Sequence, residues 1–397
     1  MSTLDVLLGS TRVGTLEQFE DEEYVFTFDS DWLLNPERPV LGQLFEDRKP
    51  GDIATSGLPC WFAHLLPQNV LRRAISRQFG IPEYEDFDLL RLLGEDLPGA
   101  VIVRAGSSPL PRRRAEGGPP PPLSTGPLRF SLAGAQWKLS VREGERGLTL
   151  PVEGQTGSWI AKFHDPNYKN LPRIEFATMR WAAESGIPIP PLRLGNVSEF
   201  ELLPEGIPTG DGTVYLIQRF DRMVGGGRIH IEDMGQVIDK PPGTPQYSGR
   251  YEHIASVLAA LAPEDVRDFC ERIVFCVVCG NTDAHLKNWS LIYPDARHPR
   301  LSPAYDLVAS VLFVPPLVDE LALELGGSRR FESIRLESFR LFAEVTELSF
   351  EEVANWVRQA AERIRTVWQE KAGQLPYLPA ERTRLEAHMA RVPLLTD

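Results

Sequence analysis

The chain has 397 residues, of which 42% are hydrophobic, and its formal net charge is −13. This length is enough for two domains, or for one large enzyme fold with an added module. The charge opposes contact with a phosphate backbone, so no direct DNA binding is expected, and no apolar run reaches the roughly 18 to 20 residues that span a bilayer.

The start of the chain and its cysteines indicate the compartment. Met1 to Asp5 lacks the basic and apolar segments of a signal peptide. Cys276 and Cys279 have a C-x2-C spacing, but a zinc site would need a second pair and a redox motif would need an exposed helix start. We therefore expect buried core thiols in a soluble, cytoplasmic protein without a membrane partner.

The first hundred residues predict a small α+β module. Alternating and helical apolar patterns there are separated by turn residues. The predicted elements are a hairpin over 6–16, a strand over 24–28, helices over 61–67 and 87–94, and a strand over 100–103. His64 lies on the apolar face of the first helix, and we expect it to be a packed histidine and not a ligand.

A change of composition marks the end of this module. Residues 107–127 are rich in Pro, Gly, Ser and Arg, with consecutive prolines from Pro119 to Pro122. Such a tract cannot bury a core and tends to be extended. We interpret it as a linker; a ligand segment for an SH3-type domain is the alternative.

The segment after the linker has features of a nucleotide-binding sheet. Residues 129–141 predict a hairpin whose small residues could approach phosphates, although one glycine is a weak signal by itself. Lys162 in a predicted strand and Glu175 in a predicted helix suit the ion pair that positions ATP in kinases. A surface lysine on an edge strand is an equal alternative. Residues 214–222 predict a strand that ends in a hinge for an adenine ring.

The polar residues that follow an apolar run at 273–279 carry the strongest chemical signal. Gly280 breaks that run, so these residues should lie on a loop held from behind. Asp283 and Asn288, followed by Asp306, have the order of a kinase base and its two magnesium ligands. From the spacing alone, turn-forming Asp and Asn are the more probable explanation. The rest of the chain predicts helices.

Four motifs in this order resemble the HipA-like serine/threonine kinases, the toxin kinases of bacterial toxin–antitoxin pairs. The N-terminal module also resembles the N-terminal domain of that family over 62–67 and 87–100. The four motifs are a S-x-x-G-A-Q-x-K loop at Phe130 to Lys138, an RFDR segment at Gln218 to Arg222, a G-x-T-D-x-H-x-K-N loop at Gly280 to Asn288, and a YD segment at Ser302 to Asp306.

The resemblance implies an α+β, two-lobed protein-kinase-like fold. Its expected parts are an N-terminal subdomain (1–106), the linker (107–127), a kinase N-lobe (128–223) and a largely helical C-lobe with the catalytic loop (224–397). It further implies a serine/threonine kinase that uses ATP and Mg²⁺. Such kinases phosphorylate translation components such as aminoacyl-tRNA synthetases and are held inactive by a small helix-turn-helix antitoxin. A small-molecule kinase and a catalytically weak antitoxin-binding protein are the alternatives.

The resemblance also assigns residues to roles. Asp283 is the implied catalytic base, Asn288 and Asp306 are the metal ligands, Glu175 pairs with Lys162, and Ser131 matches an autophosphorylated serine. The implied nucleotide contacts are Ala133, Gly134, Ala135, Gln136, Lys138, Lys162, Gln218, Arg219, Phe220, His285, Lys287, Asn288, Tyr305 and Asp306. Trp137 and Gln218 stand where the best-known members carry acidic residues, so we expect loop and hinge contacts to differ in detail.

Overall fold

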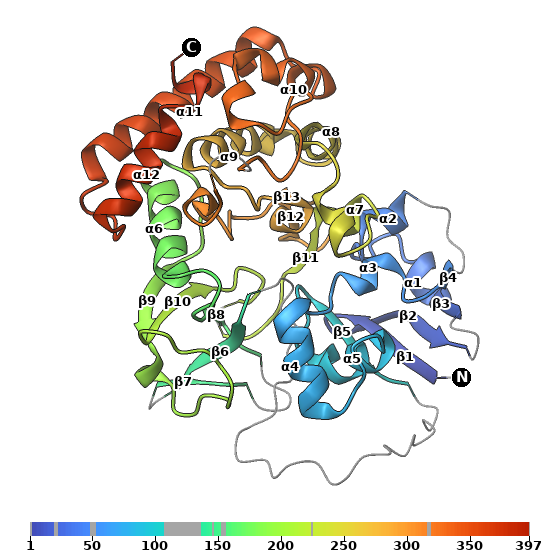
Figure 1. Cartoon of the computed structure of the whole chain (residues 1–397). Helices are drawn as coiled ribbons and strands as arrows, with labels where there is room; N and C mark the ends of the chain where they lie inside the picture. The colour runs from blue at the N-terminus through green and yellow to red at the C-terminus, as the bar shows by residue number, and fades with distance from the viewer. Residues whose placement is uncertain are drawn as a thin grey trace.

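The chain folds into an N-terminal module, a second sheet and a helical lobe, as the computed structural model shows (Figure 1). Both sheets and helices contribute, so the fold is α+β, as predicted. The residues described are 2–19, 23–47, 53–106, 136–144, 147–151, 156–223, 225–315 and 319–396.

The N-terminal module is a five-stranded antiparallel sheet covered by short helices. Leu4, Val6 and Leu8 are buried and alternate with partly exposed neighbours, so one face of the sheet makes the core. The strands run in the order β4-β3-β2-β1-β5, over Ser2–Leu8 (β1), Thr11–Gln18 (β2), Glu23–Phe28 (β3), Ile53–Ser56 (β4) and Val101–Ala105 (β5). The helices are Ser30–Leu34 (α1), Gln43–Glu46 (α2), Cys60–Ala63 (α3), Asn69–Phe79 (α4) and Asp86–Leu93 (α5).

The predicted elements of this module are largely confirmed. The hairpin and the strand at 24–28 correspond to β1, β2 and β3, and the helix at 87–94 corresponds to α5. The helix predicted at 61–67 is shorter, because α3 ends at Ala63 and Pro67 cannot continue it. Helix α4 was not predicted.

The second sheet has the order β7-β6-β8-β10-β9 and carries one long helix. Lys162 on β8 stands opposite Lys138 on β6 and opposite Tyr215 on β10. Helix α6 (Leu171–Glu184) contacts β10 and turns its other face to the helical lobe. The strands are Lys138–Gly144 (β6), Gly147–Thr149 (β7), Trp159–Lys162 (β8), Leu192–Asn196 (β9) and Thr213–Gln218 (β10).

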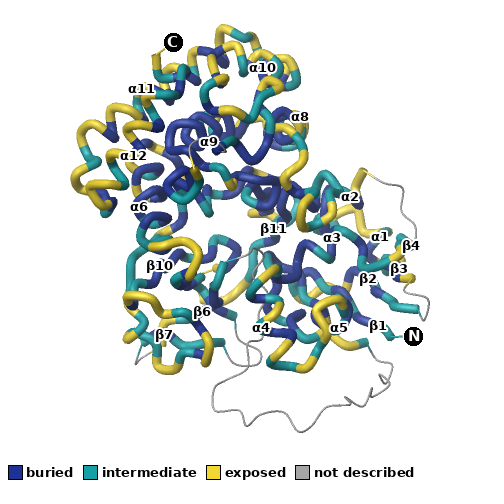
Figure 2. Tube along the Cα trace, in the orientation of Figure 1, coloured by how far each residue is buried: buried dark blue, intermediate teal, exposed yellow. Residues whose placement is uncertain are grey.

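The helical lobe is built around α9 (Val266–Cys279), which is buried along the whole of its second half (Figure 2). Helix α11 packs along it, which explains the apolar run that ends at Gly280. The other helices are Met234–Val237 (α7), Tyr251–Leu261 (α8), Arg340–Val345 (α10), Phe350–Lys371 (α11) and Pro379–Met389 (α12). A small sheet is formed by His230–Asp233 (β11), Ser290–Tyr293 (β12) and Arg300–Leu301 (β13).

Short 3₁₀ helices complete the chain. They occupy Gly94–Asp96, Val197–Glu199, Thr244–Tyr247, Pro263–Asp265, Leu286–Asn288, Ser310–Leu312, Phe331–Ser333, Leu336–Phe339 and Pro393–Leu395. Among the helices of the described ranges, none is long and apolar enough to cross a membrane.

The N-terminal module and the second sheet share one hydrophobic core. Leu139, Ala161 and Leu216 of the second sheet are fully buried in the same cluster as Val6 and Phe62 of the module. A second cluster surrounds α9 and includes the inner face of α6. The N-terminal module therefore packs directly against the second sheet.

A buried polar network strengthens this junction. Asp96, just before β5, accepts hydrogen bonds from Arg219 at 3.0 Å and from Arg222 at 2.7 Å. Asp221 accepts from the same two guanidinium groups at 2.9 and 2.7 Å. Ser140 on β6 donates to Asp96 at 3.0 Å. Two buried cations thus face two buried anions where the module, the sheet and the segment after β10 meet.

The four cysteines are free thiols, as predicted. Cys270, Cys276 and Cys279 are fully buried on α9, and Cys60 is half-buried at the start of α3. Burial raises the pKa of both Cys60 and Cys276 to about 12. These thiols fill the core and do not form a site.

Candidate active site

The loop after α9 is shaped by its first residue. Gly280 has a φ of 70°, in the left-handed region that favours glycine. A Cβ at this position would lie 2.5 Å from the Val311 side chain and 3.0 Å from His388. Val311 donates its N–H to the Gly280 carbonyl at 3.0 Å. Because the glycine lets the chain turn sharply here, the polar residues leave a rigid, buried helix in a fixed direction.

Asp283 is held in place by hydrogen bonds on both sides. Its N–H donates to Asn281 Oδ1 at 2.9 Å, and Thr282 N–H donates to Ser310 Oγ at 2.6 Å. The Tyr247 hydroxyl donates to Asp283 Oδ1 at 2.8 Å. The carboxylate is open to a cavity but lies deep among protein atoms, and this burial raises its pKa. Asp283 is thus an oriented carboxylate with one oxygen free of protein donors among the described residues.

The strand lysine and the helix glutamate form the ion pair that the sequence suggested. Lys162 on β8 contacts Glu175 on α6 and also Asp306, and the lysine and glutamate are buried. Burial acts to lower the pKa of Lys162, but Asp306 and Glu175 outweigh it and raise the pKa. The structure therefore rules out the alternative of a surface lysine on an edge strand.

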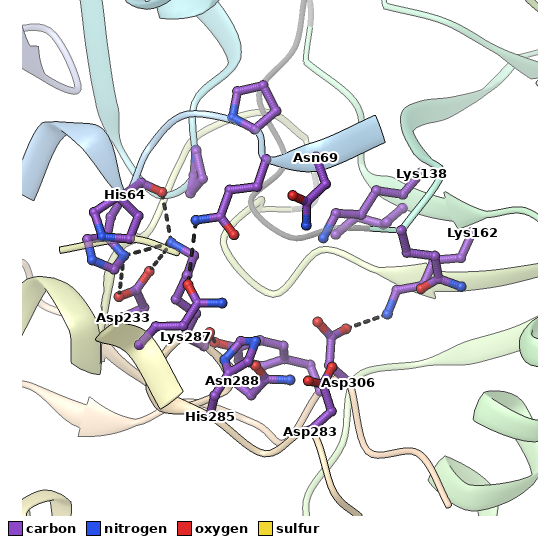
Figure 3. A pocket seen from close by; sticks show the side chains of 18 of the residues that line it. His64, Asn69, Lys138, Lys162, Asp233, Asp283, His285, Lys287, Asn288 and Asp306 are labelled. Atoms are coloured by element: carbon purple, nitrogen blue, oxygen red, sulfur yellow. Dashed lines mark hydrogen bonds and ion pairs between the residues drawn. The ribbon is translucent and has the colours of Figure 1, made fainter. Parts of the chain in front are cut away.

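Lys138 and Asp306 complete the charged end of the site (Figure 3). Lys138 is buried beside Lys162, and this burial lowers its pKa to about 8. Burial acts to raise the pKa of Asp306, but Lys162 and Lys138 outweigh it and hold the pKa at about 2. Asp306 is therefore ionised at neutral pH, and two ammonium groups stand where phosphate groups could bind.

The second half of the loop faces the same space. Figure 3 shows Asn288 and His285 beside Asp306 and Asp283, with Asp306 joined to Lys162 by their ion pair. His285 packs edge-on against Tyr247, with ring centroids 4.5 Å apart. Its Nδ1 is buried without a hydrogen-bond partner among the residues described.

The segment after β10 forms another wall. The N–H groups of Gln218 and Arg219 donate to Pro191 and Ser158 carbonyls at 2.8 and 2.9 Å, which fixes this main chain. The Phe220 ring lies 5.5 Å from the Tyr305 ring. Phe220 and Tyr305 can therefore cover a flat, apolar group such as a base.

Two of the predicted nucleotide contacts use their side chains elsewhere. The Arg219 guanidinium is bound to Asp96 and Asp221. The Lys287 ammonium is bound to His64 and Asp233. Buried carboxylates hold both cations, but Arg219 and Lys287 still line the cavity, so their part in nucleotide binding stays a prediction.

All the predicted site residues that the structure describes line one cavity of about 1010 Å³. They are Gln136, Lys138, Lys162, Glu175, Gln218, Arg219, Phe220, Asp283, His285, Lys287, Asn288, Tyr305 and Asp306. Ser131, Ala133, Gly134 and Ala135 lie outside the described residues.

The cavity also has walls that sequence reasoning missed. Gln68 and Asn69 reach it from the start of α4, and Tyr247 reaches it from a 3₁₀ helix. Asp233 and His64 line it as well. Tyr247 lies in a segment with three prolines and no periodic pattern, so no local signal identified it.

Comparison with known families agrees with this geometry. A family model described as the HipA-like C-terminal domain matches residues 130–368, and one described as the HipA N-terminal domain matches residues 4–104. The chain belongs to the HipA-like kinase family. The resemblance of the sequence motifs to HipA-like kinases is thereby confirmed.

Relatives match over nearly the whole HipA-like chain. Y4dM of Sinorhizobium fredii, named a putative kinase, is 34% identical and the match covers 100% of this chain and 98% of Y4dM. The serine/threonine-protein kinase toxin HipA of Shewanella oneidensis is 24% identical over 97% of this chain and 93% of its own. A solved complex of Shewanella oneidensis HipA, HipB and operator DNA matches with a TM-score of 0.70 at 22% identity, covering 99% and 96% of the two chains. The last match confirms the predicted HipA-like fold.

Proposed function

We propose that the chain is an ATP-dependent serine/threonine protein kinase that acts as the toxin of a toxin–antitoxin pair. The observation that carries this proposal is the position of Lys162, which contacts Glu175 and Asp306 in the cavity that Asp283 also lines. This is the arrangement in which kinases hold ATP phosphates beside a catalytic carboxylate. The proposal follows the domain boundaries expected from the sequence.

In the proposed reaction, each described group has one task. Lys162 and Lys138 hold the phosphate groups, while Phe220 and Tyr305 cover the adenine. Asp283 accepts the proton of a Ser or Thr hydroxyl through the oxygen that Tyr247 does not occupy, and the same contact orients that hydroxyl for attack on the γ-phosphorus. The hydroxyl oxygen forms a bond to phosphorus as the bond to the β-phosphate oxygen breaks, which leaves ADP.

The residues present fit a magnesium ion. Asn288 and Asp306 supply an amide and a carboxylate oxygen on one side of the cavity (Figure 3). Among the described parts of the chain, no group of three or more His, Cys, Asp or Glu could hold a metal alone. Mg²⁺ needs only one or two side chains and takes its other ligands from phosphates and water. When bound, the ion neutralises charge on the phosphates.

Asp306→Ala is expected to raise the Mg²⁺ concentration for half-maximal phosphorylation by about 10–100-fold. The substitution removes a carboxylate that is ionised at neutral pH, while Lys162 keeps its contact with Glu175. Magnesium titrations of the phosphorylation rate measure this. Asp165→Ala is the control, because this carboxylate lines the same cavity but accepts from the Asn167 N–H; an equal effect in both variants would contradict the metal role.

Tyr247→Phe is expected to move the acidic limb of the kcat profile to higher pH. Burial raises the pKa of Asp283, and the Tyr247 hydrogen bond opposes this by stabilising the carboxylate. Without the hydroxyl, the pKa of Asp283 rises further. When the pH is lowered, the base therefore takes up its proton, and activity is lost, at a higher pH than in the unmodified chain. Rates measured between pH 5 and 9 test this; an unchanged profile would show that Asp283 is not the titrating base.

The proposed partners follow from the family. We propose a translation component such as an aminoacyl-tRNA synthetase as substrate, a small helix-turn-helix antitoxin as inhibitor, and Ser131 as the autophosphorylated residue. The Shewanella complex contains HipB and operator DNA, which supports an antitoxin. The expectation of no direct DNA contact gains no support from that complex and rests on the charge of −13 alone.

Labelled phosphate transfer from ATP tests the proposed function. Purified chain, with Asp283→Asn as the inactive control, is incubated with Mg²⁺-ATP and a bacterial lysate, and phosphorylated proteins are identified by mass spectrometry. We expect phospho-Ser or phospho-Thr on a small set of translation proteins, and on Ser131 of the chain itself. Equal labelling by both forms, or labelling of small molecules only, would refute a protein kinase.

A further inference from the structure

The catalytic loop is bonded directly to the N-terminal module through Lys287. Its ammonium group donates to His64 Nδ1 at 2.8 Å, to the His64 carbonyl at 3.0 Å and to Asp233 Oδ2 at 2.8 Å (Figure 3). His64 is 1% exposed and Lys287 is 6% exposed. His64 thus contacts a buried cation that lies 223 positions away in the chain.

The partners of Lys287 are themselves fixed. His64 Nε2 bonds to the Lys240 carbonyl at 2.6 Å, and Nδ1 lies 2.8 Å from Lys287 Nζ and 3.2 Å from Asp233 Oδ1. In the tautomer that donates Nε2–H to the carbonyl, Nδ1 accepts from Lys287. Asp233 caps α7 by accepting from Gln236 N–H at 3.0 Å. The Gln236 side chain donates to the Trp61 carbonyl, also at 3.0 Å. The acceptors therefore form a rigid frame made from both the module and the helical lobe.

Lys287 is also connected, through its main chain, to Asn288 and Asp306, the two residues assigned to the metal. It directly precedes Asn288 in the 3₁₀ helix that follows His285. Its carbonyl accepts from the Tyr305 hydroxyl at 2.8 Å, and Tyr305 directly precedes Asp306. The same hydroxyl bonds to Ser290 Oγ at 2.6 Å. A movement of Lys287 would therefore shift Asn288 and Tyr305 together.

We propose that His64 is a positioning residue for phosphoryl transfer, which makes the N-terminal module part of the catalytic machinery. By accepting from Lys287, His64 fixes the main chain that presents Asn288 and supports Tyr305 beside Asp306. This inference rests on the proposed kinase function and deepens it. In the simpler alternative, the His64 ring only fills space between the module and the lobe.

Two substitutions of His64 distinguish these roles. In His64→Asn, the side-chain oxygen lies near the place of Nδ1 and can accept from Lys287, whereas the bond to Lys240 is lost. In His64→Gln, the longer amide reaches toward Lys240 and leaves Lys287 without that acceptor. Both variants remove the ring, so a packing role predicts equal effects on activity.

We expect His64→Gln to lower kcat about tenfold and to raise the Mg²⁺ requirement by a similar factor, as when outer partners of metal ligands are lost. His64→Asn should keep kcat within about threefold of the unmodified chain, because the Lys287 contact is retained. The assay is phosphorylation of a protein substrate by full-length chain at varied Mg²⁺, with thermal melting of each variant measured in parallel.

Each result of these experiments either supports or overturns the positioning role of His64. Equal activities of the Asn and Gln variants would overturn the positioning role. A His64→Gln protein that does not fold would also overturn it, because the contacts of His64 would then serve the stability of the fold. Lys287→Gln tests the link from the other side and should reproduce the His64→Gln signature. No Mg²⁺-ATP-dependent transfer by the unmodified chain would refute the proposed function itself, separately from this inference.

Discussion

Asp283→Asn is expected to lower kcat for phosphoryl transfer by about 10²–10⁴-fold, the usual contribution of a general base. The amide keeps the shape of the carboxylate and an oxygen that can accept from Tyr247. It cannot take the proton of the acceptor hydroxyl, so orientation survives in part while proton transfer is lost. Lys162, Lys138 and Asp306 are unchanged, and ATP affinity should stay close to that of the unmodified chain.

Calorimetric titration with Mg²⁺-ATP and single-turnover phosphorylation separate the two effects. A loss of kcat with unchanged ATP dissociation constant supports the role of Asp283 as the base. Phosphorylation near the unmodified rate would mean that another group accepts the proton. A matching loss of ATP binding would instead place Asp283 among the nucleotide contacts.

Asp96→Ala is expected to reduce the free energy of unfolding by about 3–5 kcal/mol, the cost of breaking a buried ion pair from one side. Asp96 bonds to Arg219 at 3.0 Å and to Arg222 at 2.7 Å, and all three side chains are buried. Without this carboxylate, Asp221 alone faces two guanidinium groups. The buried positive charge left without a partner and the lost hydrogen bonds together reduce the free energy of unfolding.

Denaturant unfolding of the full chain measures this change. Asp88→Ala is the matched control, because Asp88 lies in the same module and pairs with Arg91 at 3.0 Å on the surface. Exposed pairs contribute less than about 1 kcal/mol. Equal losses for Asp96→Ala and Asp88→Ala would contradict the view that the buried network holds the module against the sheet.

Local patterns predicted much of the fold. Apolar segments on either side of a turn located β1 and β2, and period-two alternation located β3, because one face of the sheet is buried. The apolar run before Gly280 located the end of α9, because the second half of that helix is buried on all sides. The strand lysine and helix glutamate were ambiguous, since either can be exposed. The sheet decides the question: β8 lies between β6 and β10, so Lys162 is central and not on an edge.

What could not be predicted depends on contacts between distant segments. The link from His64 to Lys287 joins two parts of the chain that share no periodic pattern. Arg219 and Lys287 were assigned to the nucleotide site by their positions in family motifs, but a sequence does not show which partners a side chain binds. Both side chains bind buried carboxylates, and no local pattern identifies Asp96 and Asp233 as those partners.

The buried cysteines make the chain convenient for spectroscopy. Maleimide dyes react with a thiolate, which the raised pKa of Cys60 and Cys276 suppresses, and Cys270 and Cys279 are fully buried. A cysteine introduced at an exposed position such as Leu34 or Leu378 would therefore take up a fluorophore selectively, with the native thiols left in place. A dye pair at these positions would report the separation of the N-terminal module and the helical lobe during turnover.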